Sequence, residues 1–315
     1  MSLCLSKSQN YIVQFYNGVI FSTDIYYKTA VISKQAANFL KINFHKKTYK
    51  INNIILHVMN KKTLITTLLI IVGILMITFF VRDWLVFYNC GAVEQCLVES
   101  SNYQNIAKFA VTAIMTVIVF FIGKNCLCKR DRNFLQAGFA MALCADFCLK
   151  IMHNYSHVLE HRSDYTLLGI CFFMVVQALF IYRHTRTSDT DNSSPWVLCI
   201  PFAVMFILNA LHLFRIFEGP TVPIIGTYAT FLFSSLYVAC QAPKKGYFPA
   251  KNAKNIKRGM ILFVCCDVCV GISLATGEDH SVQEIIATVA NNFVWYFYTP
   301  ALILLGLSGY KRKDG

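Results

Sequence analysis

The chain has 315 residues, of which 56% are hydrophobic and only 14% are charged, and its formal net charge is +13. Soluble domains carry about 25% charged residues, so this composition, with a mean hydropathy of +0.50, excludes a soluble globular protein. Disorder is excluded as well, because disordered chains are poor in apolar and aromatic residues and 14% of this chain is aromatic. The class that remains is a polytopic membrane protein.

Residues 1–58 are basic and contain no apolar run long enough to span a membrane. The charged stretch Met59-Asn60-Lys61-Lys62 follows, and the apolar run that comes next completes the pattern of an uncleaved signal anchor. We therefore expect an N-terminal extension over 1–58 and a transmembrane domain over 59–315. Two interpretations of the extension stay open: translated sequence upstream of a true start at Met59, or a mobile cytoplasmic tail.

A spanning helix needs about 20 mostly apolar residues, and eight such runs follow one another with short polar connections. They are too long and continuous for the alternating pattern of barrel strands. The sequence therefore predicts an all-α bundle of eight transmembrane helices, near 64–81, 106–123, 134–152, 166–183, 195–214, 222–240, 257–275 and 285–308.

Lysine and arginine predict the orientation of these helices, because cytoplasmic loops retain them. With the start of the first run inside, 17 of the 29 basic residues fall on the inner side, five on the outer side and seven in the first 58 residues. This bias predicts that both termini are cytoplasmic. It also accounts for the positive net charge, so we expect no nucleic-acid partner.

Two of the 16 acidic residues are expected inside the bundle, Asp146 in the third run and Asp267 in the seventh. All other acidic residues are expected in loops, in tails or at the edges of the runs. A carboxylate at the centre of a spanning helix costs about 2.5–3.5 kcal/mol on insertion scales, and such residues usually face the interior and have a function. Because the third and seventh helices run in the same direction, the two aspartates can meet at a similar depth.

The surroundings of the two aspartates predict different roles. Lys150 lies four residues after Asp146, on the same helical face, whereas the basic residues nearest to Asp267 in its own helix are more than two turns away. We therefore expect a charged Asp146 and a neutral Asp267, and such a pair supplies one base and one acid. The alternative is that each aspartate cross-links helices structurally.

Other polar side chains share the interior. Each one alone is more often an interhelical hydrogen-bond partner than a functional group, but together they allow a polar cavity. The candidates for substrate binding are Gln177, Tyr228, Asn292, Trp295 and Tyr298.

No metal or cofactor is expected. His153, His157 and His161 recur at every fourth residue and could align as metal ligands on a helix, but a solvated outer loop is the favoured interpretation. Cys90 and Cys96 lie in the first outer loop and could form a disulfide in an oxidising compartment. Phosphate loops, nucleophile elbows and His-Glu-x-x-His helices are absent from the sequence.

Both aspartates lie in recognisable motifs. GFAMALCADFCL at 138–149 is similar to the first aspartate motif of the lysoplasmalogenase (YhhN-like) membrane proteins, and GMILFVCCD at 259–267 resembles the second. NFVWYFYTPA at 292–301, with LGLSG at 305–309, resembles the final span of that family. The resemblance covers roughly residues 60–310.

The resemblance implies hydrolysis of the vinyl ether bond of choline or ethanolamine lysoplasmalogens to a fatty aldehyde and a glycerophospho head group. On this basis Asp267 is expected to be the acid, and Asp146 the carboxylate that stabilises the cation and activates water. The partners are then a lysophospholipid substrate within the bilayer and the membrane lipids. Four positions depart from the family pattern and put the identity of the substrate in question: Ala145, Gln177, Cys266 and Leu302.

The principal alternative is a proton-coupled transporter that uses the same two aspartates at a midplane site. A non-enzymatic sensor or scaffold is a third class, and it would tolerate replacement of both aspartates. The short start at Met59 favours the inner membrane of a bacterium as the location of this multi-pass protein.

Overall fold

The computed structural model describes residues 61–90, 94–152, 162–187, 195–217, 219–275 and 281–311. The chain divides into two compact units, Met1–Thr66 and Thr67–Gly315, and the architecture below is that of the second unit. The predicted extension 1–58 and the three histidines after the third run lie outside the described residues. The side chains of Cys90 and Cys96 are not described either, so the disulfide stays a prediction.

Helices account for all the regular structure in the described part of the chain, apart from an isolated bridge between Cys126 and Tyr310. Each of the eight predicted apolar runs coincides with one α-helix, which confirms the all-α class for these residues. The helices are α2 (Lys61–Cys90), α3 (Glu94–Phe120), α4 (Lys129–Asp146), α6 (Arg162–His184), α7 (Cys199–Leu213), α8 (Thr221–Gln241), α9 (Ala250–Ala275) and α10 (Ser281–Leu307).

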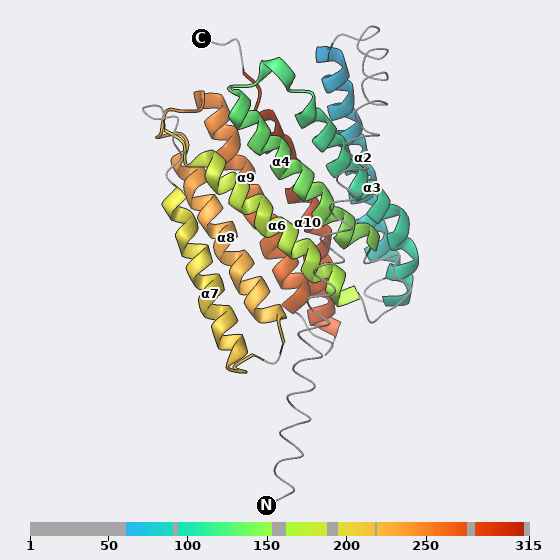
Figure 1. Cartoon of the computed structure of the whole chain (residues 1–315). Helices are drawn as coiled ribbons and strands as arrows, with labels where there is room; N and C mark the ends of the chain where they lie inside the picture. The colour runs from blue at the N-terminus through green and yellow to red at the C-terminus, as the bar shows by residue number, and fades with distance from the viewer. Residues whose placement is uncertain are drawn as a thin grey trace, which may run out of the picture. The chain divides into compact units, whose positions relative to one another are not determined.

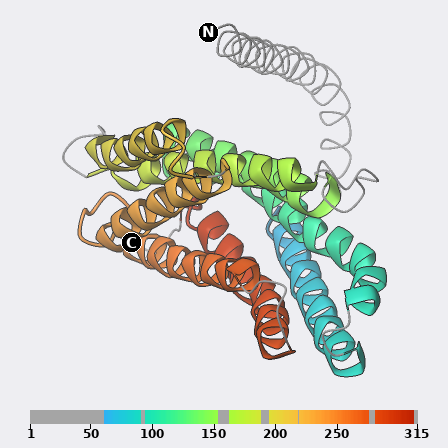
Figure 2. The same cartoon turned by 90° about the horizontal axis from the view of Figure 1, so that it is seen from below.

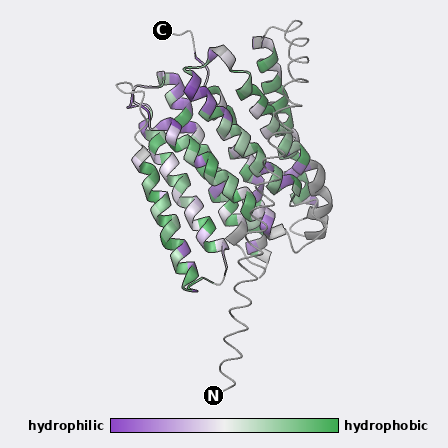
Figure 3. Cartoon of the chain, viewed as in Figure 1, coloured by the Kyte–Doolittle hydropathy of each residue, from purple (hydrophilic) through white to green (hydrophobic). Residues whose placement is uncertain are grey.

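Five helical segments are long and apolar enough to cross a membrane by length and composition. They are Lys62–Asn89, Lys129–Met152, Asp164–His184, Trp196–Leu213 and Thr221–Gln241. Large apolar side chains also point outward, as in α7, where Phe206 is 77% and Leu213 82% exposed. Figure 3 shows hydrophobic residues along the length of the helices. The protein is therefore an integral membrane protein whose apolar outer faces suit contact with lipid.

Six helices are connected in a closed cycle of contacts: α3 with α4, α4 with α6, α6 with α8, α8 with α9, α9 with α10, and α10 with α3. Figures 1 and 2 show α10 between α9 on one side and α3 on the other. Helix α7 packs outside the cycle against α8. Helix α2 contributes Phe79, whose ring lies 5.8 Å from that of Trp295 in α10. Side chains that point into the cycle can therefore come from six helices.

Helices α9 and α10 approach each other closely at Gly259. A Cβ atom at this position would lie 2.8 Å from Leu305 Cγ and 3.3 Å from the carbonyl oxygen of Ala301. Because real Cβ atoms essentially never lie closer than 3.0 Å to another heavy atom, a larger residue would require Leu305 or one of the two helices to shift. The glycine thus allows the close approach of the helix that carries Asp267.

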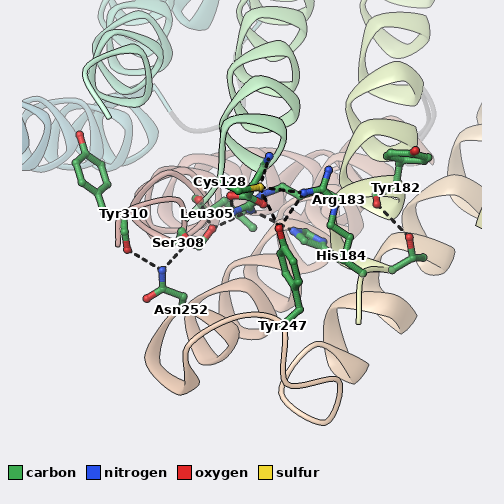
Figure 4. Close-up of polar contacts among 12 residues, drawn as sticks. Cys128, Tyr182, Arg183, His184, Tyr247, Asn252, Leu305, Ser308 and Tyr310 are labelled. Atoms are coloured by element: carbon green, nitrogen blue, oxygen red, sulfur yellow. Dashed lines mark hydrogen bonds and ion pairs between the residues drawn. The ribbon is translucent and has the colours of Figure 1, made fainter. Parts of the chain in front are cut away.

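A buried polar network joins the ends of α4, α6, α9 and α10 (Figure 4). Arg183 donates from Nε to Asp131 Oδ1 at 2.9 Å and from Nη2 to Asp131 Oδ2 at 3.1 Å. Its Nη1 donates to Ser308 Oγ at 2.9 Å. The Asn252 amide donates to the carbonyl oxygens of Ser308 and Tyr310, each at 2.8 Å. We call these five residues the Arg183 network.

Arg186 extends this end of the bundle into the loop between α8 and α9. Its Nη1 donates to the Tyr247 hydroxyl at 3.0 Å, and its guanidinium lies over the rings of Phe134 and Tyr247 at 5.5 and 5.6 Å. Burial, helped by the contact with Cys128, raises the pKa of Tyr247 to about 12, so this hydroxyl is neutral at physiological pH. These contacts join helix ends that the bias of lysine and arginine assigns to the inner side of the membrane.

Candidate active site

Asp146 is the last residue of α4 and lies inside the cycle of helices, with 2% of its surface exposed. Thr112 of α3 donates its hydroxyl to Asp146 Oδ2 at 2.6 Å, and Tyr298 of α10 donates to the same oxygen at 2.9 Å. Two hydroxyl donors from two neighbouring helices stabilise a carboxylate at this position.

The chain changes its helical form directly after Asp146. Residues Phe147–Met152 form a π-helical segment (η2), a rare element that is common at functional sites. Helix α6 packs tightly on it, because a Cβ atom at Gly169 would lie 2.6 Å from Leu149 Cγ. Lys150 lies in this segment and interacts electrostatically with Asp146, in agreement with their spacing in the sequence.

Asp267 lies in α9 and is half-buried. The hydroxyl of Tyr228 in α8 donates to Asp267 Oδ2 at 2.5 Å. Within the described part of the chain, neither Asp267 nor Asp146 forms an ion pair within 4.0 Å. Both carboxyl groups are therefore held by neutral hydroxyl groups.

The fold brings the two aspartates into one site. Their carboxyl groups interact electrostatically, and Cys266, which is 4% exposed, interacts with both. The two carboxyl groups meet because the helices that carry them, α4 and α9, belong to the same cycle, as do the helices that supply their hydroxyl partners.

The YhhN family model matches residues 103–308. The chain belongs to the YhhN family. This family includes lysoplasmalogenases. The matched range contains every helix of the cycle apart from the first residues of α3, and it leaves out α2. Neither the curated proteins nor the solved structures give a match.

Two further candidates, Trp295 and Gln177, lie near the tyrosines that bind the carboxyl groups of this YhhN protein. The Tyr298 ring makes edge contacts with Phe263 and Trp295 at 5.6 and 5.0 Å between ring centroids. Gln177 is fully buried in α6 and interacts with the Tyr228 hydroxyl, yet neither its amide nitrogen nor its oxygen has a hydrogen bond among the described residues. The role of Gln177 in binding substrate stays a prediction.

Each of the six helices in the cycle therefore contributes a polar side chain to the site. These side chains are Thr112 of α3, Asp146 of α4, Gln177 of α6, Tyr228 of α8, Asp267 of α9 and Tyr298 of α10.

Asn292 is the candidate that lies apart from the carboxyl groups. It is 6% exposed, and its amide donates to the carbonyl oxygen of Asp83 at 3.4 Å. It precedes Tyr298 by six residues, about 9 Å along the helix axis. The structure therefore places Asn292 between α10 and α2, and its role in binding substrate stays a prediction.

Sequence reasoning missed several polar contacts. Asp83 and Asp131, expected at the edges of runs, are 6% and 0% exposed, because Lys108 pairs with Asp83 at 2.9 Å and Arg183 pairs with Asp131. Thr112 was not singled out, although Thr112 and Thr116 lie four residues apart inside an apolar run. Such a pair on one helical face is a usable signal of an inward polar surface.

The described residues contain no group of three or more His, Cys, Asp or Glu side chains that could hold a metal ion. The cysteines beside the aspartates, Cys144, Cys148, Cys265, Cys266 and Cys269, are free thiols.

Proposed function

We propose that this YhhN protein is a lysoplasmalogenase that hydrolyses the vinyl ether bond with Asp146 and Asp267. The observation that carries the proposal is the pair of interacting carboxyl groups inside the membrane domain, each bound by a tyrosine hydroxyl. Buried ionisable groups are costly in a membrane and mark functional sites. The reaction also needs two such groups, since a vinyl ether must be protonated on carbon and then attacked by water.

The two carboxyl groups suit different steps because their surroundings differ. Asp146 accepts two hydroxyl hydrogen bonds and lies near the Lys150 ammonium, so its anionic form is the better stabilised. Asp267 has one hydroxyl partner and is repelled by Asp146. We therefore assign the anion to Asp146 and the protonated carboxyl to Asp267.

In the first step Asp267 transfers its proton to the outer alkenyl carbon, and the carbon bonded to oxygen becomes an oxocarbenium ion. The Asp146 carboxylate stabilises this cation electrostatically. Asp146 then accepts a proton from water as the water oxygen bonds to the cationic carbon, which gives a hemiacetal. This division of labour parallels that of glycosidase carboxyl pairs.

In the second step the hemiacetal hydroxyl returns its proton to Asp267, and Asp146 gives its proton to the leaving glycerol oxygen. The bond between the hemiacetal carbon and this oxygen breaks. The products are a fatty aldehyde and the glycerophospho head group, and both carboxyl groups are restored for the next cycle.

We further propose that all eight helices cross the bilayer, with both termini on the cytoplasmic side of a bacterial inner membrane. The helix ends around the Arg183 network carry basic residues assigned to the inner side, as the charge rule requires. The alkenyl chain of a lysoplasmalogen then lies among the lipids, and its first carbons reach the carboxyl pair.

The test is aldehyde release from choline and ethanolamine lysoplasmalogens by purified protein in detergent. We expect Asp146→Asn and Asp267→Asn each to lower kcat by about 10²–10⁴, the usual contribution of a general acid or base. The matched control is Asp164→Asn, at an exposed carboxyl in the first turn of α6, which keeps full activity.

Full activity in both aspartate variants would overturn the assignment of the site. If the wild-type protein releases no aldehyde, the proposed reaction is wrong. Uptake of solute driven by a pH gradient in proteoliposomes, abolished by the same two substitutions, would then establish the transporter alternative.

A further inference from the structure

Gln177 lies on the face of α6 that turns toward both carboxyl groups. Phe173 precedes it by four residues, and this spacing places the two side chains on one face of the helix. The Phe173 ring makes edge contacts with Phe263 and Tyr298, at 5.9 and 6.2 Å between ring centroids. Gln177 itself interacts with the hydroxyl of Tyr228. This face of α6 therefore adjoins the tyrosine that binds each carboxyl group.

The hydrogen bond of Tyr228 decides which end of the Gln177 amide can face it. A tyrosine hydroxyl has one hydrogen, and Tyr228 donates it to Asp267 Oδ2 at 2.5 Å. The oxygen of this hydroxyl can then only accept, so the Gln177 amide can approach it only through an N–H group. The carbonyl oxygen Oε1 of Gln177 is left for another partner.

This carbonyl oxygen is a buried acceptor without a donor. Gln177 is 0% exposed, and its Oε1 atom forms no hydrogen bond in the part of the chain that the structure describes. Buried polar groups in native structures are nearly always hydrogen-bonded, so an unsatisfied one calls for a bound partner. Asp267 and Tyr228 are only half-buried, so such a partner can come from outside the chain.

We propose that Gln177 Oε1 accepts a hydrogen bond from the free hydroxyl on the central glycerol carbon of the lysoplasmalogen. This inference rests on the proposed function, since it concerns the same substrate at the same site. In a choline lysoplasmalogen this hydroxyl is the one hydrogen-bond donor at neutral pH, because the quaternary ammonium carries no N–H and the phosphate is ionised. No other group of that lipid can satisfy the unused acceptor.

The distances in the site and in the lipid are compatible. The Tyr228 hydroxyl lies between the Gln177 amide and Asp267, and two successive hydrogen bonds span roughly 6 Å. In the lipid, the ether oxygen and two glycerol carbons separate the alkenyl group from the hydroxyl, a span of roughly 4–6 Å at ordinary bond lengths. Asp267 can therefore protonate the outer alkenyl carbon while Gln177 holds the hydroxyl.

The contact makes Gln177 a specificity-determining residue. A second acyl chain replaces the hydroxyl by an ester, which has no hydrogen to donate. Binding of such a lipid leaves Gln177 Oε1 buried without a donor. Sites that bond a substrate hydroxyl discriminate strongly against analogues that lack it, because their own polar groups are then left unpaired. The protein is therefore expected to act on lipids with one chain and to reject those with two.

The experiment compares two lipids that differ only in this hydroxyl. One is a saturated alkyl-ether lysophosphatidylcholine, which has no vinyl ether to cleave, and the other is its deoxy analogue with hydrogen in place of the hydroxyl. Dissociation constants are measured by tryptophan fluorescence with the full chain in nanodiscs. We expect the wild type to bind the hydroxylated lipid at least about tenfold more tightly, the effect of an unpaired buried acceptor.

Gln177→Met keeps the length of the side chain but removes the amide, so it should bring the ratio of the two dissociation constants close to one. A partly misfolded variant lowers the signal for both lipids, so the ratio still reports the contact. The matched control is Gln136→Met, the same substitution at a half-buried glutamine of α4 that donates to the Val119 and Phe120 carbonyl oxygens. This control should keep the wild-type ratio.

Equal binding of the two lipids by the wild type would overturn the proposal and assign Gln177 Oε1 to an ordered water. An unchanged ratio in Gln177→Met would overturn it as well, since another residue would then bind the hydroxyl. Neither lipid is cleaved, so a wild type that releases no aldehyde refutes the hydrolase, while the binding ratio decides the role of Gln177. A ratio near one in a protein that releases aldehyde refutes only that role.

Discussion

Helix α4 carries a buried aspartate near each end, and the two are held in different ways. Asp131 lies in the first turn and receives two parallel hydrogen bonds from the Arg183 guanidinium, at 2.9 and 3.1 Å. Asp146 is the last residue and receives hydrogen bonds from the neutral hydroxyls of Thr112 and Tyr298. Both carboxyl groups are almost completely buried.

Under the proposed function, this difference separates a structural site from a reactive one. A carboxylate paired side-on with arginine has its charge compensated and its geometry fixed, so it ties α4 to α6. A carboxylate whose hydrogen bonds come from neutral hydroxyl groups, with no side-on ion pair, keeps its capacity to exchange a proton. Burial alone therefore does not distinguish the two aspartates, whereas the kind of partner does.

The largest effect on stability is expected from Asp131→Asn. Removing one member of a buried pair leaves the Arg183 charge uncompensated and costs about 3–5 kcal/mol. Unfolding of the purified protein by SDS should therefore begin at a lower denaturant fraction, while activity per folded molecule stays near that of the wild type. The double variant Asp131→Asn with Arg183→Met should recover much of the loss. A variant as stable as the wild type would show that the pair is not structural.

Removing hydroxyl partners of the reactive carboxyl groups should act on catalysis with little effect on stability. Tyr298→Phe deletes a donor to the Asp146 carboxylate, and we expect kcat to fall by about 10–100-fold, the cost of a lost hydrogen bond to a charged group. Tyr228→Phe should have a smaller effect at neutral pH if Asp267 is protonated. A larger loss in Tyr228→Phe than in Tyr298→Phe would reverse the assignment of acid and base.

The smallest effect on stability is expected at Tyr247, in the loop between α8 and α9 that contacts Arg186. Tyr247→Phe removes the acceptor for Arg186 and should cost about 1 kcal/mol of stability. Because the pKa of Tyr247 is raised to about 12, its contribution is complete below the ordinary value near 10 and is lost as the pH rises through 12. The difference in thermal stability between wild type and variant should therefore shrink over this alkaline range. A constant difference would contradict the assigned contact.

Patterns along the chain predict local elements and the main candidates of the site. Long apolar runs specify helices because the backbone must satisfy its own hydrogen bonds in lipid, and each run coincides with a helix from α2 to α10. Asp146 and Asp267 stand out because charge is rare in such runs. Their neighbours in space could not be predicted in the same way, since Thr112 and Tyr228 lie in other helices and resemble ordinary interhelical polar residues.

The sequence by itself determined the membrane class, the helical segments, the two aspartates and membership of the YhhN family, because these depend on composition, local periodicity and short motifs. Tertiary structure alone decided that six helices close a cycle, that Asp131 is bound by Arg183 and Asp146 by hydroxyl groups, and that Lys108 pairs with Asp83. The physical reason is that the partner of a buried charge is set by which helices touch and at what depth, and these contacts join residues far apart in the chain.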